Sequence, residues 1–404
     1  MIKLVQKLGP GLLFAGAAIG VSHLVQSTKA GANFGFGLLW ALLLINLVKY
    51  PFFQYGPRYA SATGESLLEG YQKLGKLALT CYAILTFGTM FTIQTAVTIV
   101  TAGIAFSIFD LNLSIEVWTI IILVLCFIVL SIGKYNLLDS IMKIIIILLS
   151  LSTIAAVSMA FFKHSNPISW SQILPKTEVE ILFLIAFMGW MPAPLDVSIW
   201  HSLWAIQKKK SLSNFNVKTA LLDFNIGYLG TIILGIGFLM LGGLVMYGSG
   251  KSFSNNGSEF SLQLIEMYTQ NLGNWTYIII GAAALTTMFS TTLTTLDASP
   301  RALNKSLELL RGRTQENGYN LWLIILIIGT ISIFIFFLSE MGTLVKIATI
   351  LSFLTAPFYA IMNYTLICSK YTPKDWKPSK LMHLWSIAGI IFLIGFNIWY
   401  LSIL

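Results

Sequence analysis

The sequence is poor in charge. Asp, Glu, Lys and Arg make up only 10% of its 404 residues, whereas soluble domains carry about 25%. Hydrophobic residues account for 56%, and the mean hydropathy is +0.80. These values exclude an ordinary soluble domain and predict an all-α membrane protein with many spans. The formal net charge of +9 therefore does not indicate a nucleic-acid partner, because membrane proteins place such an excess in basic cytoplasmic loops.

Cysteine is also scarce. Cys81, Cys126 and Cys368 lie in apolar segments without paired spacing, so neither a disulfide framework nor a zinc site is predicted. No pore-loop, nucleotide-binding or catalytic-triad motif is present, so we expect neither a channel nor an enzyme, and no cofactor. The first twenty residues resemble a signal peptide, but the pattern continues into a polar, Gly-rich stretch and another apolar segment. This favours a retained helix.

Long apolar runs are abundant. Segments of about 20 residues can cross the hydrocarbon core of a bilayer, and we count eleven: Leu8–Asn33, Phe36–Tyr59, Leu77–Phe109, Leu113–Ile132, Ile141–Phe162, Ile181–Trp204, Ala220–Tyr247, Trp275–Leu296, Leu321–Leu338, Leu344–Cys368 and Leu384–Leu404. The pattern predicts one transmembrane domain over residues 1–404. Its longest loops are residues 248–274 and 297–320.

The charges orient this arrangement. Most Lys and Arg residues fall in alternate loops, the ones that are cytoplasmic if the N-terminus is inside. We therefore expect a multi-pass protein of the inner (plasma) membrane of a bacterium, with the N-terminus cytoplasmic and the C-terminus outside. The partners expected are the lipid bilayer and a small inorganic ion as substrate; no signal for an oligomeric state is present.

Two spans are interrupted by residues that suit neither lipid nor a regular helix. The first contains Gly20, Ser22 and His23 at bilayer depth, which is tolerated only where the backbone is buried in protein or lines a wet cavity. The sixth contains Pro192 and Pro194, which cannot both lie in a continuous helix.

The two interruptions occupy corresponding positions in the two halves of the chain. This pattern predicts an inverted-repeat secondary transporter with its substrate site near the membrane midplane. The first repeat would span residues 1–162, the second residues 181–368, and an extra helix residues 384–404. The alternative is a pair of unrelated kinks.

Several motifs resemble Nramp-type (natural resistance-associated macrophage protein) metal transporters. They are GPGLLFAGAAIG and KAGANFGFGLLW near the N-terminus, RYASATGESLLE at residues 58–69, Met191-Pro192, Trp200-His201-Ser202 and LSFLTAPFYA at residues 351–360. The resemblance implies the LeuT-like fold, with two inverted five-helix repeats and, here, one further helix.

The chain departs from this family at the metal site. Aligned on the shared Ala-Gly-Ala at residues 30–32, the Asp-Pro-Gly-Asn motif is replaced by Gly20, Val21, Ser22 and His23. Met-Pro-His-Asn becomes Met191-Pro192-Ala193-Pro194, and the acids of the proton path fall on Gln94 and Val97. A desolvated divalent ion is usually held by carboxylates, so we do not expect a conventional Mn²⁺ or Fe²⁺ carrier.

The remaining features favour a small anion. Half-helix N-termini near residues 21–24 and 193–196 present amides and positive dipole ends. Bicarbonate-transporting relatives of the family make that anion the expected substrate. The candidate substrate-binding residues are Gly20, Val21, Ser22, His23, Gln94, Trp190, Met191, Ala193 and Asp196.

The resemblance also suggests Na⁺ as the coupling ion. Sodium-coupled proteins of the LeuT-like fold bind Na⁺ between hydroxyls of helix 8 and unwound carbonyls of helix 1. The candidate ligands are Gly20, Asp196, Thr287, Ser290 and Thr291. These hydroxyls could equally be packing contacts between spanning helices.

Each candidate side chain also has an ordinary structural explanation. Asp196 could be a helix N-cap, His23 a buried imidazole bonded to a carbonyl, and Met191 core filler. Two rival functions therefore stay open. One is a divalent cation carrier for Mg²⁺ or Mn²⁺ that uses Asp196, Met191 and His23. The other is a membrane sensor or scaffold without transport.

Overall fold

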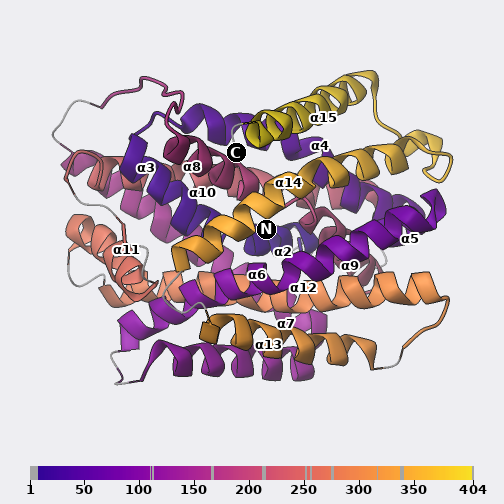
Figure 1. Ribbon diagram of the computed structural model, residues 1–404, viewed down its shortest axis with the longest axis horizontal. Coiled ribbons are helices and arrows are strands. Elements are labelled where there is room, and N and C mark those ends of the chain that lie inside the picture. Colours follow the sequence, from indigo (N-terminus) through magenta and orange to yellow (C-terminus); the bar gives the residue numbers. More distant parts are fainter. Residues whose placement is uncertain are drawn as a thin grey trace.

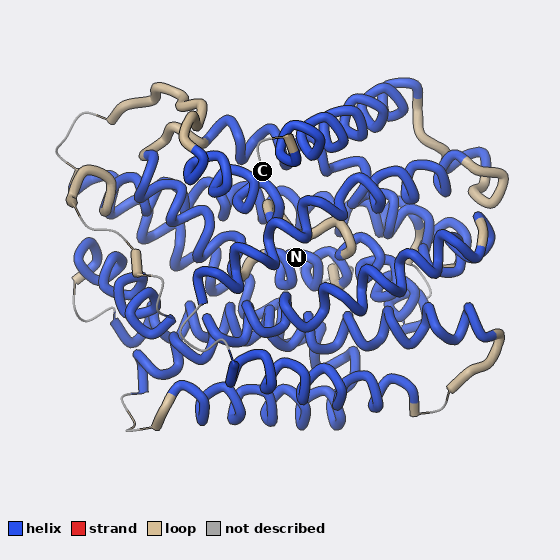
Figure 2. Tube along the Cα trace, in the orientation of Figure 1, coloured by secondary structure: helices blue, strands red, loops and turns tan. Residues whose placement is uncertain are grey.

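The computed structural model describes residues 8–402 apart from 110, 112, 165–167, 212–214, 251–252, 255–256, 274–276, 316 and 337–340. The described residues form helices joined by loops and contain no β-strand (Figures 1 and 2), which confirms the predicted all-α fold class. The helices are α2 Pro10–Ala18, η1 Ser22–Ser27 (a π-helix), α3 Thr28–Phe34, α4 Leu39–Thr63, α5 Leu67–Leu74, α6 Lys76–Phe109, α7 Ile115–Lys163, α8 Glu178–Trp190, α9 Val197–Ser211, α10 Val217–Val245, α11 Gly257–Leu272, α12 Tyr277–Arg311, α13 Gly318–Phe336, α14 Met341–Cys368, η3 Lys374–Trp376 (a 3₁₀ turn) and α15 Lys380–Leu401.

Both predicted interruptions are present. The first broken helix consists of α2 followed by η1 and α3, with a bend of 47° between its halves. The second broken helix consists of α8 and α9, separated by residues 191–196. Among the described residues, six helical stretches are long and apolar enough to cross a membrane, and the first broken helix is a seventh. The count of eleven spans stays a prediction, as does the division into two repeats.

The expected loop between the spans Leu113–Ile132 and Ile141–Phe162 is wrong. Residues 115–163 form the continuous helix α7. The intervening sequence contains no proline and only one glycine, Gly133, so nothing in it stops a helix. The two long loops also contain helix: α11 lies in the first, and α12 continues through Pro300 into the second.

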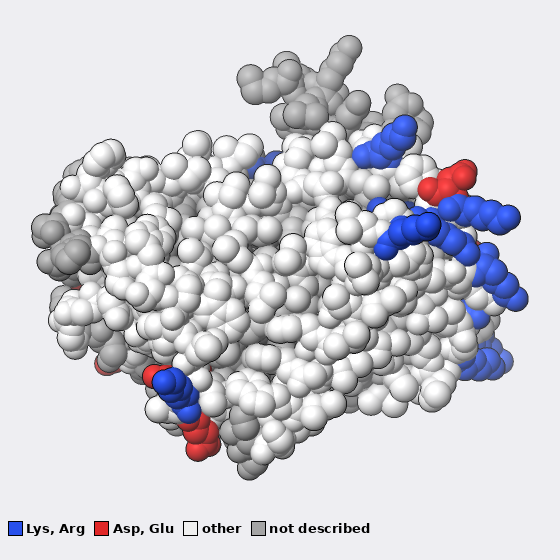
Figure 3. Space-filling view, turned by 90° about the horizontal axis from the view of Figure 1, so that it is seen from above, with Lys and Arg blue, Asp and Glu red and all other residues white. Residues whose placement is uncertain are grey.

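The surface of the helices fits a lipid environment. Large apolar side chains such as Leu47, Ile84, Ile328 and Ile391 are exposed, an arrangement typical of helices in contact with acyl chains. Lys and Arg side chains gather at one end of the molecule (right in Figure 3). The α12–α13 and α14–α15 connections lie at that end in Figure 1. This segregation agrees with the positive-inside pattern of the sequence.

Helix α10 packs against both halves of the first broken helix through glycines. A Cβ atom added to Gly242 would lie 2.1 Å from the carbonyl oxygen of Thr28, and one added to Gly31 would lie 2.0 Å from that of Leu239. The same close approach joins Gly11 and Gly227 at the other end. The absence of side chains lets the backbones touch, so α10 fixes the position of the break between these two contacts.

Gly242→Ala is expected to lower the thermal midpoint of the purified protein. The added methyl group has no space and must separate α3 from α10, at a cost of about 1–3 kcal/mol. Gly230, on the same helix, has open space at its Cβ position. Gly230→Ala is the matched control and should leave stability unchanged or raise it by up to about 1 kcal/mol. Equal midpoints for the two variants would contradict the contact.

The short helix α5 is fixed by Glu69. A capping box joins Ser66 and Glu69, in which the Ser66 amide donates to Glu69 Oε2 at 2.6 Å. Lys305 Nζ of α12 lies 3.1 Å from Glu69 Oε1. Burial raises the pKa of Glu69, but the bonds from Ser66 and Lys305 outweigh it, so the pKa lies below the ordinary glutamate value.

The lowered pKa gives a pH dependence of known sign. The stabilisation by ionised Glu69 is present above the unfolded-state pKa of about 4.3 and is lost as pH falls through the folded-state pKa. Glu69→Gln should therefore reduce the thermal midpoint at neutral pH, and the gap to the wild-type protein should narrow on acidification. Thermal melts across that range measure it. A gap that stays constant with pH would show that Glu69 acts without its charge.

Candidate functional site

The first break begins where the α2 hydrogen bonds stop. Ile19 still donates to the carbonyl of Ala15 at 2.7 Å, whereas the Gly20 amide turns to Ala18 O at 3.0 Å. The chain then resumes as the π-helix η1, with the amides of His23 and Leu24 both donating to Gly20 O at 3.1 and 2.9 Å. The carbonyls of Gly16 and Ile19 are left facing α12.

Ser22 and His23 close the break through a local network. Ser22 Oγ donates to Ala18 O at 2.5 Å and lies 2.7 Å from His23 Nδ1. The other ring nitrogen, His23 Nε2, lies 2.9 Å from the carbonyl oxygen of Thr231 on α10. Both imidazole nitrogens therefore have protein partners, and Nε2–H is the donor to Thr231. The arrangement matches the ordinary structural explanation for His23.

Thr291 of α12 meets the exposed carbonyls of the first break. Its hydroxyl lies 3.0 Å from Gly16 O and 3.2 Å from Ile19 O, with a third contact to Thr287 O in its own helix. A Cβ atom at Gly20 would lie 2.6 Å from Thr291 Oγ1. A side chain at this position, where the resemblance places the metal-binding Asp of the family, would therefore require Thr291 to shift.

The other candidate Na⁺ ligands on α12, Thr287 and Ser290, bond within that helix. Thr287 Oγ1 donates to Ala283 O, and Ser290 Oγ donates to Thr287 O, each at 2.7 Å. Gln94 of α6 accepts a 2.7 Å bond from Thr295 through its Oε1. Its amide nitrogen lies 3.3 Å from Thr292 O. Gln94 thus joins α6 to α12 beside the breaks.

The second break is organised around Lys49 of α4. The Nζ atom, on a fully buried side chain, donates to four carbonyl oxygens: Met188 at 2.9 Å, Gly189 at 2.7 Å, Met191 at 3.0 Å and Ala193 at 3.2 Å. These oxygens include the last carbonyls of α8 and those of the unwound residues after it. An ammonium group supplies three N–H donors, so all of them are used.

Lys49 was not among the site residues predicted from the sequence, although its position within a span could have indicated it. It is a lysine inside the predicted span Phe36–Tyr59, and a charge within a spanning helix is functional by default. The four acceptors could not have been foreseen, because they belong to backbone that becomes free only where the second helix unwinds.

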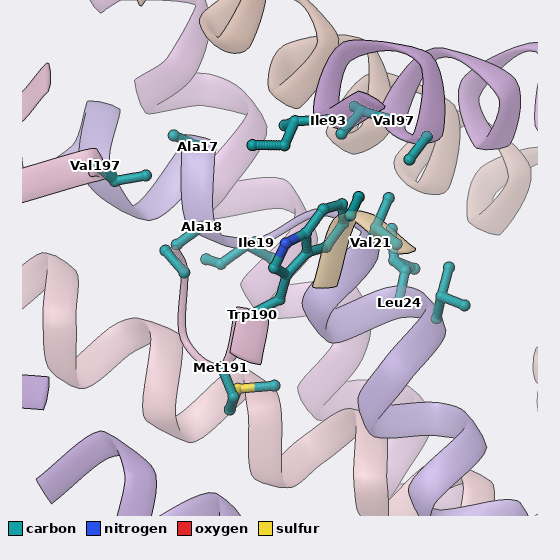
Figure 4. Close-up of a cluster of buried hydrophobic side chains, with 14 of the residues drawn as sticks. Ala17, Ala18, Ile19, Val21, Leu24, Ile93, Val97, Trp190, Met191 and Val197 are labelled. Atoms are coloured by element: carbon teal, nitrogen blue, oxygen red, sulfur yellow. The ribbon is translucent and has the colours of Figure 1, made fainter. Parts of the chain in front are cut away.

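Between the breaks lies a small cavity. Its walls are Ala17, Ala18, Val21, Ser22, Ile93, Val97, Trp190, Pro194, Val197, Trp200, Thr291 and Thr295. Figure 4 shows the Trp190 indole among Val21, Ile93 and Val97. The space open to water centres is about 20 Å³, enough for about one water molecule.

The cavity wall is mostly apolar but contains one unsatisfied donor. Trp190 Nε1 donates to Ser352 Oγ at 2.8 Å, whereas Trp200 Nε1 is buried and has no hydrogen-bond partner among the described residues. The next residue, His201, likewise has no described partner for either ring nitrogen. A buried donor without an acceptor is costly, so an acceptor of another origin would stabilise this wall.

Asp196 and Met191 lie beside this cavity rather than in its wall. Asp196 is 5% exposed, and its Oδ1 lacks a hydrogen-bond partner within the described part of the chain. Its carboxyl group interacts with the Val197 amide at the start of α9 and electrostatically with Lys49. Met191 and Ala193 are buried, and their carbonyls are engaged by Lys49.

In the part of the chain that the structure describes, the acids and histidines do not gather into a metal centre. Across the described residues, no group of three or more His, Cys, Asp or Glu side chains has the geometry to hold a metal ion. Of the proposed ligands, His23 is bonded to Ser22 and Thr231, and Asp196 interacts electrostatically with Lys49. The breaks thus offer hydroxyls, an indole N–H and helix termini.

Comparisons with known proteins agree with this architecture. The family model "Natural resistance-associated macrophage protein-like" (Nramp) matches residues 11–402. An uncharacterized protein of Pasteurella multocida (strain Pm70) is 33% identical over 401 residues, which cover 98% of this chain and 92% of that protein.

Solved transporters share the fold. A crystal structure of the Eremococcus coleocola manganese transporter superposes with a TM-score of 0.75 at 14% identity, covering 98% of this chain and 86% of that one. Mhp1, a nucleobase-cation-symport-1 family transporter, gives a TM-score of 0.62 at 15% identity, covering 98% and 93%. The neighbours have the LeuT-like arrangement of helices. The chain therefore belongs to the Nramp family of secondary transporters and is a multi-pass integral membrane protein with a LeuT-like fold.

Proposed function

We propose that this protein is a secondary-active transporter of a small anion, with bicarbonate as the expected substrate. The observation that carries the proposal is the chemistry of the cavity between the two breaks. Trp200 lines this cavity and its indole N–H has no hydrogen-bond partner among the described residues, and none of the described residues lining the cavity is acidic. An anion would accept a hydrogen bond from the Trp200 indole and would lie near the positive end of the α9 helix dipole.

The described residues at the same place provide few free oxygen ligands for a divalent cation. The backbone oxygens that could coordinate a cation at the second break already accept from Lys49. Gly20 has no side chain, and a carboxylate at this position would require Thr291 to shift. Because the cavity has room for about one water molecule, binding of a polyatomic anion requires the two breaks to separate, as alternating access does.

Na⁺ coupling is part of the proposal. Thr291 brings a hydroxyl of α12 to two carbonyl oxygens of the first break, which supports a site where Na⁺ would join the two elements. Thr287 lies one turn before Thr291 in the same helix, and Ser290 is the residue directly before it. Na⁺ held there would stabilise the position of the first broken helix, and with it the substrate site.

A divalent cation such as Mg²⁺ or Mn²⁺ is the second candidate substrate. It is favoured by the fold shared with manganese transporters and by the buried, unpartnered Oδ1 of Asp196. In this case Met191 and His23 would have to change their contacts to join Asp196. Asp196→Asn would then abolish metal flux, whereas the anion proposal assigns no metal flux to the wild-type protein.

Uptake by purified protein in liposomes separates the candidates. We expect saturable uptake of labelled bicarbonate at alkaline pH, where CO₂ leakage is small, and no saturable uptake of Mn²⁺ or Mg²⁺. Trp200→Phe should weaken substrate affinity roughly tenfold or more, because a hydrogen bond to a charged group contributes about 1.5–3 kcal/mol. Trp170→Phe, at a side chain 56% exposed, is the control. Metal uptake that does not depend on Na⁺ would overturn the proposal. No uptake of any of these ions would also overturn it and would favour a membrane sensor.

Thr291→Val tests the coupling ion. The variant keeps the shape of the side chain and removes the hydroxyl, so half-saturation by Na⁺ should rise roughly tenfold or more. Thr286→Val is the matched control, since Thr286 is exposed and bonds only to carbonyls of its own helix. Measuring uptake at increasing external Na⁺ concentration gives the half-saturation value for each variant. An unchanged Na⁺ dependence in Thr291→Val would assign the hydroxyl to helix packing alone.

A further inference from the structure

Lys49 has surroundings that proteins normally give to a bound cation. Its nitrogen is encircled by carbonyl oxygens of Met188, Gly189, Met191 and Ala193 at 2.7–3.2 Å. All four belong to one short stretch of backbone at the end of α8. The side chain is 0% exposed, so water does not compete for the ammonium group.

The ammonium group lies at the C-terminal end of α8, where a cation stabilises the helix. The C-terminus of α8 has carbonyls without helical partners and a partial negative charge. A cation at that end of the helix can donate hydrogen bonds to the free carbonyls and balance the partial negative charge. The carboxyl group of Asp196, the last of the unwound residues, interacts electrostatically with Lys49. The second break thus combines a positive group, a helix C-terminus and an acid.

We propose that Lys49 is a tethered cation that fills a cation site at the second break, and that it thereby determines which ions this transporter excludes. A mobile Na⁺ or divalent ion cannot use these four oxygens while the ammonium group occupies them. The effect on ion selectivity rests on the proposed anion substrate. The occupancy of the cation site by Lys49 is independent of the substrate, so measurements of stability alone can test that occupancy.

The chemistry of the side chain suggests the probe. Lys49→Ala removes three methylene groups and the ammonium group, which together correspond to n-propylammonium. The truncated side chain leaves a cavity of that shape, ending at the four carbonyl oxygens. Added propylammonium can therefore restore the missing group, whereas 1-propanol has a similar size without the charge.

Thermal unfolding of the purified protein in detergent is the experiment. Lys49→Ala should melt several degrees below the wild-type protein, and propylammonium should raise its midpoint saturably and by more than 1-propanol does. The wild-type protein should show no such saturable rise. Lys29→Ala is the matched control, because Lys29 is a partly buried lysine that lies over the Phe260 ring, 5.1 Å from its centroid, and not at a break. A saturable rise confined to Lys49→Ala is the expected result.

Two results would overturn the proposal. One is a propylammonium response of Lys49→Ala no larger than that of Lys29→Ala or than that to 1-propanol. If Lys49→Ala does not fold, Lys49→Met replaces it, since methionine fills the volume without a charge. Lys49→Met should melt below Lys29→Met, and equal midpoints are the second overturning result. Because both readouts are thermal, a failed uptake assay would refute the substrate without affecting this test.

Discussion

The unwound residues between α8 and α9 expose backbone carbonyl oxygens inside a protein that is itself embedded in lipid. Such groups must be satisfied internally, and the buried ammonium group of Lys49 does so with four hydrogen bonds. A buried lysine in turn needs acceptors to offset the loss of hydration. Lys49 meets both requirements at once, so it links α4 to the second broken helix at the unwound residues.

The first broken helix is held differently. Its halves rest on α10 through two glycine contacts, and its interrupted backbone is closed by Ser22, His23 and Thr291. The two breaks therefore differ in the chemical groups that they present. The first presents carbonyls to hydroxyl groups that a small cation could join, whereas the second has its own fixed cation. A site between them favours an anionic substrate and a separate coupling ion, which is the function proposed here.

The large features followed from the sequence because they depend on local chemistry. Low charge and long apolar runs predicted the all-helical membrane fold, and Gly20 with Pro192 and Pro194 predicted both breaks. The loop expected between the fourth and fifth spans was wrong, since polarity alone does not end a helix and residues 131–140 contain no proline. Lys49 was missed because its partners are carbonyls, which every residue has and which become available only through tertiary structure. The lack of space at Gly20 likewise depends on Thr291, which is 271 positions away in the chain.

If the region between the two breaks does not hold a divalent metal, as we propose, an anomalous-difference map from crystals of the wild-type protein soaked in Mn²⁺ will show it. We expect no anomalous peak between the breaks, with Lys49 in density at the carbonyls of Gly189 and Met191. A peak coordinated by Met191 and Asp196, with Lys49 displaced, would contradict it.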